Sequence, residues 1–133
     1  MDPAAHTTAF GIFSMSHTTW TDLGPVSEFP TDGHTCLDTE RPDGTRGTAL
    51  VVLNVQGQWY ALENRCPHAG LPIGDGERAG LVLTCPYHGY TYHIKTGKNI
   101  DFPDDQRRAT TFPVRVVDGR VQVQLTYDEA DNP

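Results

Sequence analysis

Residues 66–71 read Cys-Pro-His-Ala-Gly-Leu, and residues 85–90 read Cys-Pro-Tyr-His-Gly-Tyr. Each segment offers one thiolate and one imidazole within a single turn, and sixteen residues separate the first histidine from the second cysteine. The proline after each cysteine and the glycine near each histidine allow a tight loop to wrap around a metal centre. The spacing Cys-x-His and then Cys-x-x-His therefore predicts a metal site. Its four candidate ligands are Cys66, His68, Cys85 and His88.

Two kinds of metal site fit this set of donors. A Cys2His2 zinc site commonly carries its histidine pair on a helix, whereas these two histidines lie on separate loops rich in Pro and Gly. In a [2Fe–2S] cluster with mixed ligands, two cysteines hold one iron and two histidines hold the other. Two matching loops, each with one cysteine and one histidine, favour the two-iron cluster. A structural zinc module stays open as the less favoured alternative.

Short β segments surround the two loops. Thirteen glycines and ten prolines favour turns over long helices, and no window shows the apolar stripe of an amphipathic helix. Gln56-Gly57 and Asp118-Gly119 each separate two apolar runs, as in β-hairpins with two-residue turns. The sequence therefore predicts an all-β domain. Strands are expected over residues 48–55, 59–62, 81–84, 90–94, 114–116 and 121–125.

Composition limits the class of protein. The 133 residues, 37% hydrophobic, suffice for one domain with a modest core. A net charge of −7 argues against nucleic acid or an anionic membrane as the main partner. The longest uncharged apolar run, residues 49–53, is far shorter than the roughly 18 residues of a membrane span. The start of the chain carries no basic region of a secretory signal, so a cytoplasmic location is expected.

The two loop motifs resemble the signature of Rieske proteins, and the similarity extends from about Trp20 to Leu125. This resemblance implies a Rieske fold, which is an antiparallel β-sandwich with a small subdomain of two cluster-binding loops. It also implies one [2Fe–2S] cluster bound by the four candidate ligands. A third segment covers the cluster in this family and usually carries a proline, which we expect to be Pro103, after Phe102.

The resemblance, the lack of a periodic pattern in residues 1–16 and the acidic end of the chain suggest domain boundaries. A Rieske domain is expected over residues 17–127, with the cluster-binding subdomain at about residues 64–93. Residues 1–16 then form an N-terminal extension, and residues 128–133 form an acidic C-terminal tail.

Three positions indicate which Rieske proteins the chain resembles most. Respiratory-chain members add a cysteine to each loop and form a disulfide, but Leu71 and Tyr87 stand at these positions here. They also tend to carry a serine that donates to a bridging sulfide, where this chain has Tyr90. The chain therefore resembles the soluble, low-potential Rieske ferredoxins. Tyr92 points toward a higher potential, because it falls where high-potential members have a tyrosine that donates to a ligand sulfur.

The resemblance implies a non-catalytic electron carrier, and a monomer is expected because it suits a small shuttle best. It would accept single electrons from an NAD(P)H-dependent flavoprotein reductase and pass them to the terminal oxygenase of an aromatic-ring-hydroxylating dioxygenase system. The small Rieske subunit of an assimilatory nitrite reductase is the alternative. In this family the solvent-facing edges of the two histidines release the electron. Apolar residues beside them would form a collar that docks on partners. Acidic residues outside the collar would steer the protein toward a basic partner. The expected collar consists of Leu71, Pro72, Pro86 and Tyr87.

The remaining cysteine, histidines and large aromatics are expected to have ordinary structural roles. Cys36 is interpreted as a small core residue or a partly exposed one. Surface or loop positions are expected for His6, His17, His34 and His93. Core positions are expected for Trp20, Trp59 and Phe112.

Overall fold

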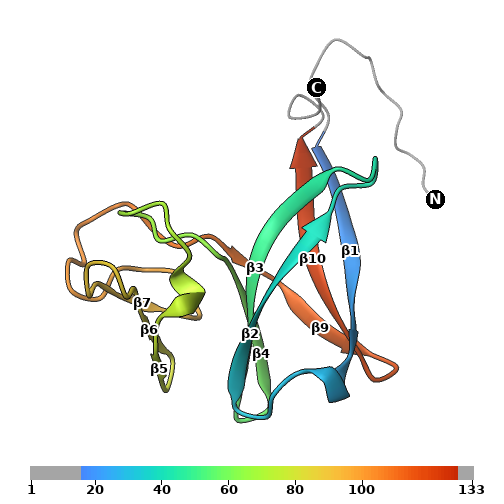
Figure 1. The fold of residues 1–133 in the computed structure, drawn as a ribbon, viewed down its shortest axis with the longest axis horizontal. Helices are drawn as coiled ribbons and strands as arrows, with labels where there is room; N and C mark the ends of the chain where they lie inside the picture. Colours follow the sequence, from blue (N-terminus) through green and yellow to red (C-terminus); the bar gives the residue numbers. More distant parts are fainter. Residues whose placement is uncertain (1–15, 129–133) are drawn as a thin grey trace.

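The computed structural model describes residues 16–128, and antiparallel strands make up most of it (Figure 1). Two short 3-10 turns interrupt the strands, and no α-helix occurs within the described residues. Among these same residues, no helix is long and apolar enough to cross a membrane. The elements are β1 (Ser16–Pro25), η2 (Val26–Glu28), β2 (Gly33–Glu40), β3 (Arg46–Val55), β4 (Gln58–Glu63), η3 (Ile73–Asp75), β5 (Arg78–Ala79), β6 (Val82–Thr84), β7 (Thr91–His93), β8 (Thr111–Phe112), β9 (Val114–Val117) and β10 (Arg120–Asp128).

The strands form three sheets, in the orders β1-β10-β9, β2-β3-β4-β8 and β5-β6-β7. The two larger sheets lie together on one side of the molecule, and the small sheet with its loops projects to the other side (Figure 1). The observed architecture confirms the expected all-β fold, with a sandwich and a small subdomain that carries both candidate loops.

Strand β3 is buried on both faces, which explains its continuous apolar run. Leu50 and Val52 face the core between the two larger sheets. Val51 and Leu53, one position along, face the core shared with the small subdomain. All four side chains are at most 1% exposed. One strand therefore joins the sandwich to the subdomain.

The two predicted hairpin turns are confirmed. Gln56 and Gly57 connect β3 to β4 with φ angles of 52° and 84°. Asp118 and Gly119 connect β9 to β10 with φ angles of 51° and 75°. Both turns place two consecutive residues in the left-handed region, where glycine and short polar residues are favoured.

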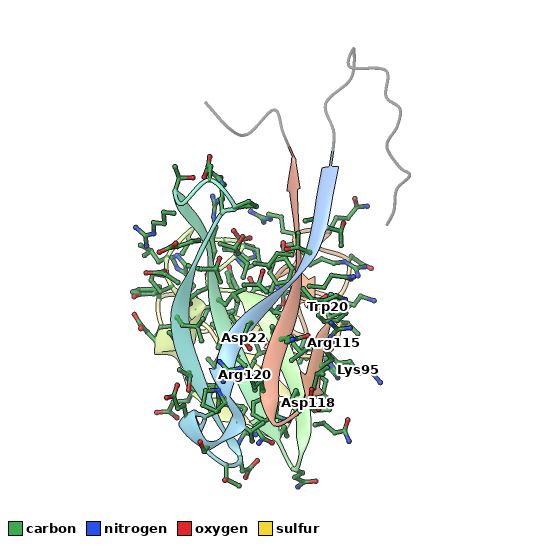
Figure 2. The ribbon with its side chains drawn as sticks, turned by 90° about the vertical axis from the view of Figure 1, so that its right-hand side faces the viewer. Trp20, Asp22, Lys95, Arg115, Asp118 and Arg120 are labelled. Carbon is green, nitrogen blue, oxygen red and sulfur yellow. The ribbon has the colours of Figure 1, made fainter. Side chains whose placement is uncertain are left out.

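The structure differs from the sequence-based expectations around Trp20. This side chain is not in the core, because it lies on the outer face of β1 beneath the Arg115 guanidinium, which is 4.0 Å from the ring centroid (Figure 2). Trp59 and Phe112 do pack against the core between the larger sheets, as expected. Strand β1 begins at Ser16, one residue inside the expected N-terminal extension, whereas residues 1–15 and 129–133 lie outside the described residues.

Candidate metal centre

The two candidate loops share one backbone geometry. The N–H of Cys66 donates to the carbonyl of Leu71 at 2.7 Å, and the N–H of Cys85 donates to the carbonyl of Tyr90 at 2.8 Å. In each loop the bond joins the cysteine to the residue five positions further along. The loops between β4 and η3 and between β6 and β7 are therefore two copies of one local structure.

A glycine four residues after each cysteine makes this geometry possible. Gly70 has a φ of 69° and Gly89 a φ of 75°, which are left-handed values that side chains rarely adopt. Each glycine N–H also donates to the carbonyl of its own cysteine, at 2.8 and 2.9 Å. These bonds close both loops tightly around their cysteine side chains.

The loops bring the two thiols together in a buried site. Cys66 and Cys85 are both fully buried, and their side chains hydrogen-bond to each other. Each sulfur also accepts N–H groups from the residues two and three positions further along its loop.

These surroundings shift the pKa values of both thiols. Burial raises the pKa of the Cys85 thiol, and its hydrogen bond with Cys66 raises it further. Burial acts in the same direction on Cys66, but the bond from Cys85 and the loop amides bring the pKa of Cys66 below its usual value. The amide donors stabilise negative charge on sulfur, which is the form that binds a metal.

His68 is held by its outer nitrogen. Its Nε2 lies 3.0 Å from Oδ2 of Asp105 and 3.4 Å from Nδ2 of Asn99, and its side chain is only 13% exposed. Since Nε2 is engaged, Nδ1 is the nitrogen left to bind a metal. His88, in contrast, is exposed to solvent.

Tyr90 joins the two histidines. Its ring centroid lies 4.3 Å from that of His68 and 6.0 Å from that of His88. The ring of Phe102 meets Tyr90 edge-on at 5.4 Å. Tyr90 therefore contacts both imidazoles, and within residues 16–128 its hydroxyl makes no hydrogen bond with either thiol.

Tyr92 lies beneath the thiols. It is fully buried, and its hydroxyl is 3.9 Å from Sγ of Cys66. Burial raises the pKa of Tyr92, and the negative charge of Cys66 raises it further. The hydroxyl consequently keeps its proton and can donate it to the sulfur.

A third segment, which contains Asn99, Phe102 and Asp105, contacts residues of both loops. The amide of Asn99 accepts from the N–H of Phe102 at 3.0 Å, and its other end contacts His68. Pro103 itself is exposed. Asp105 and Asn99, the residues of this segment that reach a candidate ligand, were missed from the sequence, because nothing there distinguishes them from neighbouring polar residues.

The four collar residues are all exposed, and Leu71 and Tyr87 expose 44% and 43% of their surface. The Tyr87 hydroxyl donates to Asp75 at 3.0 Å. The surroundings are not uniformly acidic, because three arginines line a hollow of about 240 Å³ beside the first loop. This hollow is lined by Glu63, Arg65, Pro67, Arg107, Arg108 and Thr110.

Other candidate residues take no part in the centre. Cys36 is exposed on β2, Nε2 of His34 lies 3.0 Å from the Gly74 carbonyl, and Nδ1 of His93 accepts from the N–H of Lys95. His6 and the side chain of His17 lie outside the described part of the chain.

The donor set fits a two-iron cluster with mixed ligands. The structure presents two adjacent buried thiols and, on the same loops, two imidazoles. Soft thiolates on one iron and imidazoles on the other are the ligands of a mixed-ligand [2Fe–2S] cluster.

Comparisons with known proteins agree with this chemistry. The ferredoxin component of the naphthalene 1,2-dioxygenase system of Pseudomonas putida is 32% identical over 80 residues, which cover 60% of this chain and 76% of that protein. The Sphingomonas yanoikuyae B1 ferredoxin has 29% identity and a TM-score of 0.68, over 80% of this chain and 99% of that one.

Two further solved structures share the fold. A complex of reduced oxygenase and oxidized ferredoxin in carbazole 1,9a-dioxygenase matches with 27% identity and a TM-score of 0.64, over 78% of this chain and 91% of that one. A protein described as the small subunit of an NADH-dependent nitrite reductase, from Mycobacterium tuberculosis, matches with 20% identity and a TM-score of 0.65, over 82% and 96%. The Rieske [2Fe-2S] domain family matches residues 19–118. On its loops, its fold and this match, the chain belongs to the Rieske [2Fe-2S] family.

Proposed function

We propose that the protein is a Rieske ferredoxin of an aromatic-ring-hydroxylating dioxygenase system. It carries single electrons from an NAD(P)H-dependent flavoprotein reductase to the terminal oxygenase and catalyses no reaction itself. The observation that carries this proposal is the pair of matched loops, with buried thiols inside and an exposed imidazole at the surface. The ferredoxin components among its relatives support the same role.

The cofactor of the family is a Rieske-type [2Fe–2S] cluster, which takes up and releases one electron at a time when bound. In the proposed assignment, Cys66 and Cys85 hold one iron, and His68 and His88 hold the other. Two thiolates balance the +2 charge of two ferric ions and two sulfides, so an added electron meets less negative charge than with four thiolates.

The surrounding residues adjust how readily the site accepts an electron. Loop amides and the Tyr92 hydroxyl donate toward sulfur, and they favour the reduced state because it carries more negative charge. Burial of the thiols excludes water from them. Tyr90 stands where high-potential members have a serine that donates to a bridging sulfide, so one donor fewer is expected here than in those proteins. The expected potential therefore lies in the lower part of the Rieske range of roughly −150 to +300 mV.

The four collar residues supply the proposed docking surface, and all of them are exposed. Leu71 and Pro72 close the first loop, and Pro86 and Tyr87 lie between Cys85 and His88 in the second. An apolar centre with charged groups around it is typical of transient partners, which must bind and release quickly. In this proposal the protein works as a monomer in the cytoplasm.

The first experiment is an electron paramagnetic resonance spectrum of the purified protein after reduction with dithionite. We expect the low average g value of a histidine-ligated [2Fe–2S] cluster. Cys66→Ser and Cys85→Ser should abolish this signal, whereas Cys36→Ser, at the exposed cysteine, should retain it. A colourless sample that contains zinc and takes up neither iron nor sulfide would contradict the proposal.

The nitrite reductase alternative rests on the shared fold alone, at 20% identity. Purification from the native host separates the two functions. A shuttle should be isolated alone and should reduce a terminal oxygenase in stopped-flow mixing. A fixed subunit should copurify with a larger enzyme whose nitrite reduction requires it.

A further inference from the structure

Asp105 is the one carboxylate within hydrogen-bonding distance of a candidate cluster ligand in the described residues. Its Oδ2 lies 3.0 Å from Nε2 of His68, and both side chains are largely buried, with exposures of 15% and 13%. We propose that Asp105 is a positioning residue, which orients His68 for the cluster and lowers its reduction potential. This inference rests on the proposed ligand role of His68.

The geometry sets the direction of this hydrogen bond. When Nδ1 of His68 binds a metal, Nε2 carries the remaining ring proton and must donate it. The Asp105 carboxylate is an acceptor, whereas the nearby Nδ2 of Asn99 is a donor and lies further away, at 3.4 Å. The Oδ1 of Asn99 accepts from the N–H of Phe102, which fixes the amide in this orientation. Asp105 is therefore the acceptor for His68.

A carboxylate behind a metal-bound imidazole makes the ring a stronger electron donor. Stronger donation and the added negative charge both stabilise the oxidised, more positive iron. The proton donors around the thiols act in the opposite direction, since they stabilise the reduced state. Asp105 thus opposes the loop amides and the Tyr92 hydroxyl.

Arg107 holds Asp105 in place from the solvent side. Its guanidinium contacts both carboxylate oxygens, with Nε 3.2 Å from Oδ1 and Nη2 3.1 Å from Oδ2. The Arg107 side chain is 60% exposed, so its charge is partly screened by water. The arginine therefore orients the carboxylate and offsets only part of its charge.

The two loops differ at this point, although their backbones match. His88 is exposed and has no carboxylate within hydrogen-bonding distance in the described part of the chain. The asymmetry assigns different tasks to the two imidazoles. His68 adjusts the potential, and His88 faces the partner.

The test compares the reduction potentials of Asp105→Asn and Asp104→Asn, measured by spectroelectrochemistry at one pH and ionic strength. Asp104 is the adjacent, exposed aspartate, so the control changes the net charge equally without touching His68. We expect Asp105→Asn to favour the reduced protein about tenfold more than the control does, which is about 59 mV for a one-electron couple. Pulsed EPR should show altered nitrogen couplings of a ligating imidazole in this variant only.

A second pair of variants keeps the test decisive if Asp105→Asn does not retain its cluster. Arg107→Gln removes the positive charge that offsets part of the Asp105 carboxylate. The equilibrium should therefore favour the oxidised protein about threefold more in this variant than in Arg108→Gln, the adjacent exposed control. Opposite signs for the aspartate and arginine variants support the proposal. Equal potentials within either matched pair overturn it.

These outcomes are separate from those of the proposed function. A wild-type protein without the signal of a histidine-ligated cluster contradicts the ferredoxin assignment itself. A normal signal in the wild type, with no difference between Asp105→Asn and Asp104→Asn, contradicts only the role of Asp105.

Discussion

Replacing Tyr92 by Phe removes one buried hydroxyl and leaves the packing of the ring unchanged. The hydroxyl lies 3.9 Å from Sγ of Cys66, and the tyrosine is fully buried in the core beneath the loops. The sulfur carries more negative charge after reduction, so the donated hydrogen bond stabilises the reduced protein more than the oxidised one. Its loss should therefore lower the reduction potential.

The magnitude follows from the geometry. A hydrogen bond to a charged group contributes about 1.5–3 kcal/mol, but this contact is long and its acceptor is a sulfur. Only the difference between the two oxidation states affects the potential. We therefore expect about 1 kcal/mol, which is about 40 mV for a one-electron couple.

The assay is a spectroelectrochemical titration of the holoprotein, with Tyr90→Phe as the matched control. Tyr90 also contacts the site, but within the described residues its hydroxyl makes no hydrogen bond with either thiol, so its loss should shift the potential much less. An unchanged or raised potential in Tyr92→Phe would refute the assignment of the hydroxyl as a donor to sulfur.

Three further predictions concern stability and cluster retention. In Gly76→Ala the new Cβ would overlap a backbone carbonyl of β6, so we expect a loss of about 3 kcal/mol, or about 12 °C in Tm. In Gly44→Ala the Cβ meets open space, and only the φ of 87° costs about 1 kcal/mol; equal Tm values would contradict the overlap. Leu83→Ala and Leu125→Ala should each lose about 2–5 kcal/mol by chemical denaturation. Only Leu83→Ala, in the core with the thiols, should lower the iron content per chain, and equal iron contents would contradict the division into two cores. For Asp22→Asn, the hydrogen bond from an arginine on β10 holds the pKa of the wild-type carboxyl below its usual value. The ionised carboxyl therefore stabilises the fold above about pH 4, and this contribution is lost as pH falls through the lowered pKa. The Tm of Asp22→Asn should lie below that of the wild type at pH 7, and the difference should vanish in acid; a difference that widens in acid would contradict this reasoning.

Local signals explain which parts of the fold could be predicted. Gln56-Gly57 and Asp118-Gly119 specify their hairpins because both residues of each turn adopt positive φ. The continuous apolar run of β3 predicts a strand buried on both faces. These features depend on residues adjacent in sequence, so the sequence alone contains the necessary information.

Strands β1 and β2 lacked such a signal. The first half of β1 is rich in threonine, and its pairing with β10 joins the two ends of the described chain. Trp20 was wrongly placed in the core, because a large aromatic side chain usually indicates burial. Thr19 and Thr21 pair with Leu125 and Val123, which are core residues of β10. Trp20 lies between these two threonines and pairs with Gln124, so its side chain points to the outer face. That face is decided by register across distant strands, which the residue type does not specify.

In the candidate site, too, local features were predicted and contacts between distant segments were not. The spacing of cysteines, histidines and glycines predicted two loops, and the structure brings the two thiols together. The assignment of the four residues as cluster ligands stays a prediction until the cysteine variants are measured. Asp105 could not be predicted, because its contact with His68 joins two segments through folding and not through a motif.

A one-residue offset accounts for the different surroundings of the two histidines. The loops have equivalent hydrogen bonds, but His68 lies two positions after its cysteine and His88 lies three positions after its own. The third segment covers the first position through Asp105 and Asn99 and leaves the second exposed. Under the proposed function, this difference between the two histidines is useful to an electron carrier, because the covered imidazole can set the potential without contacting a partner. The exposed imidazole can then meet a reductase and an oxygenase in turn, with the same potential toward both.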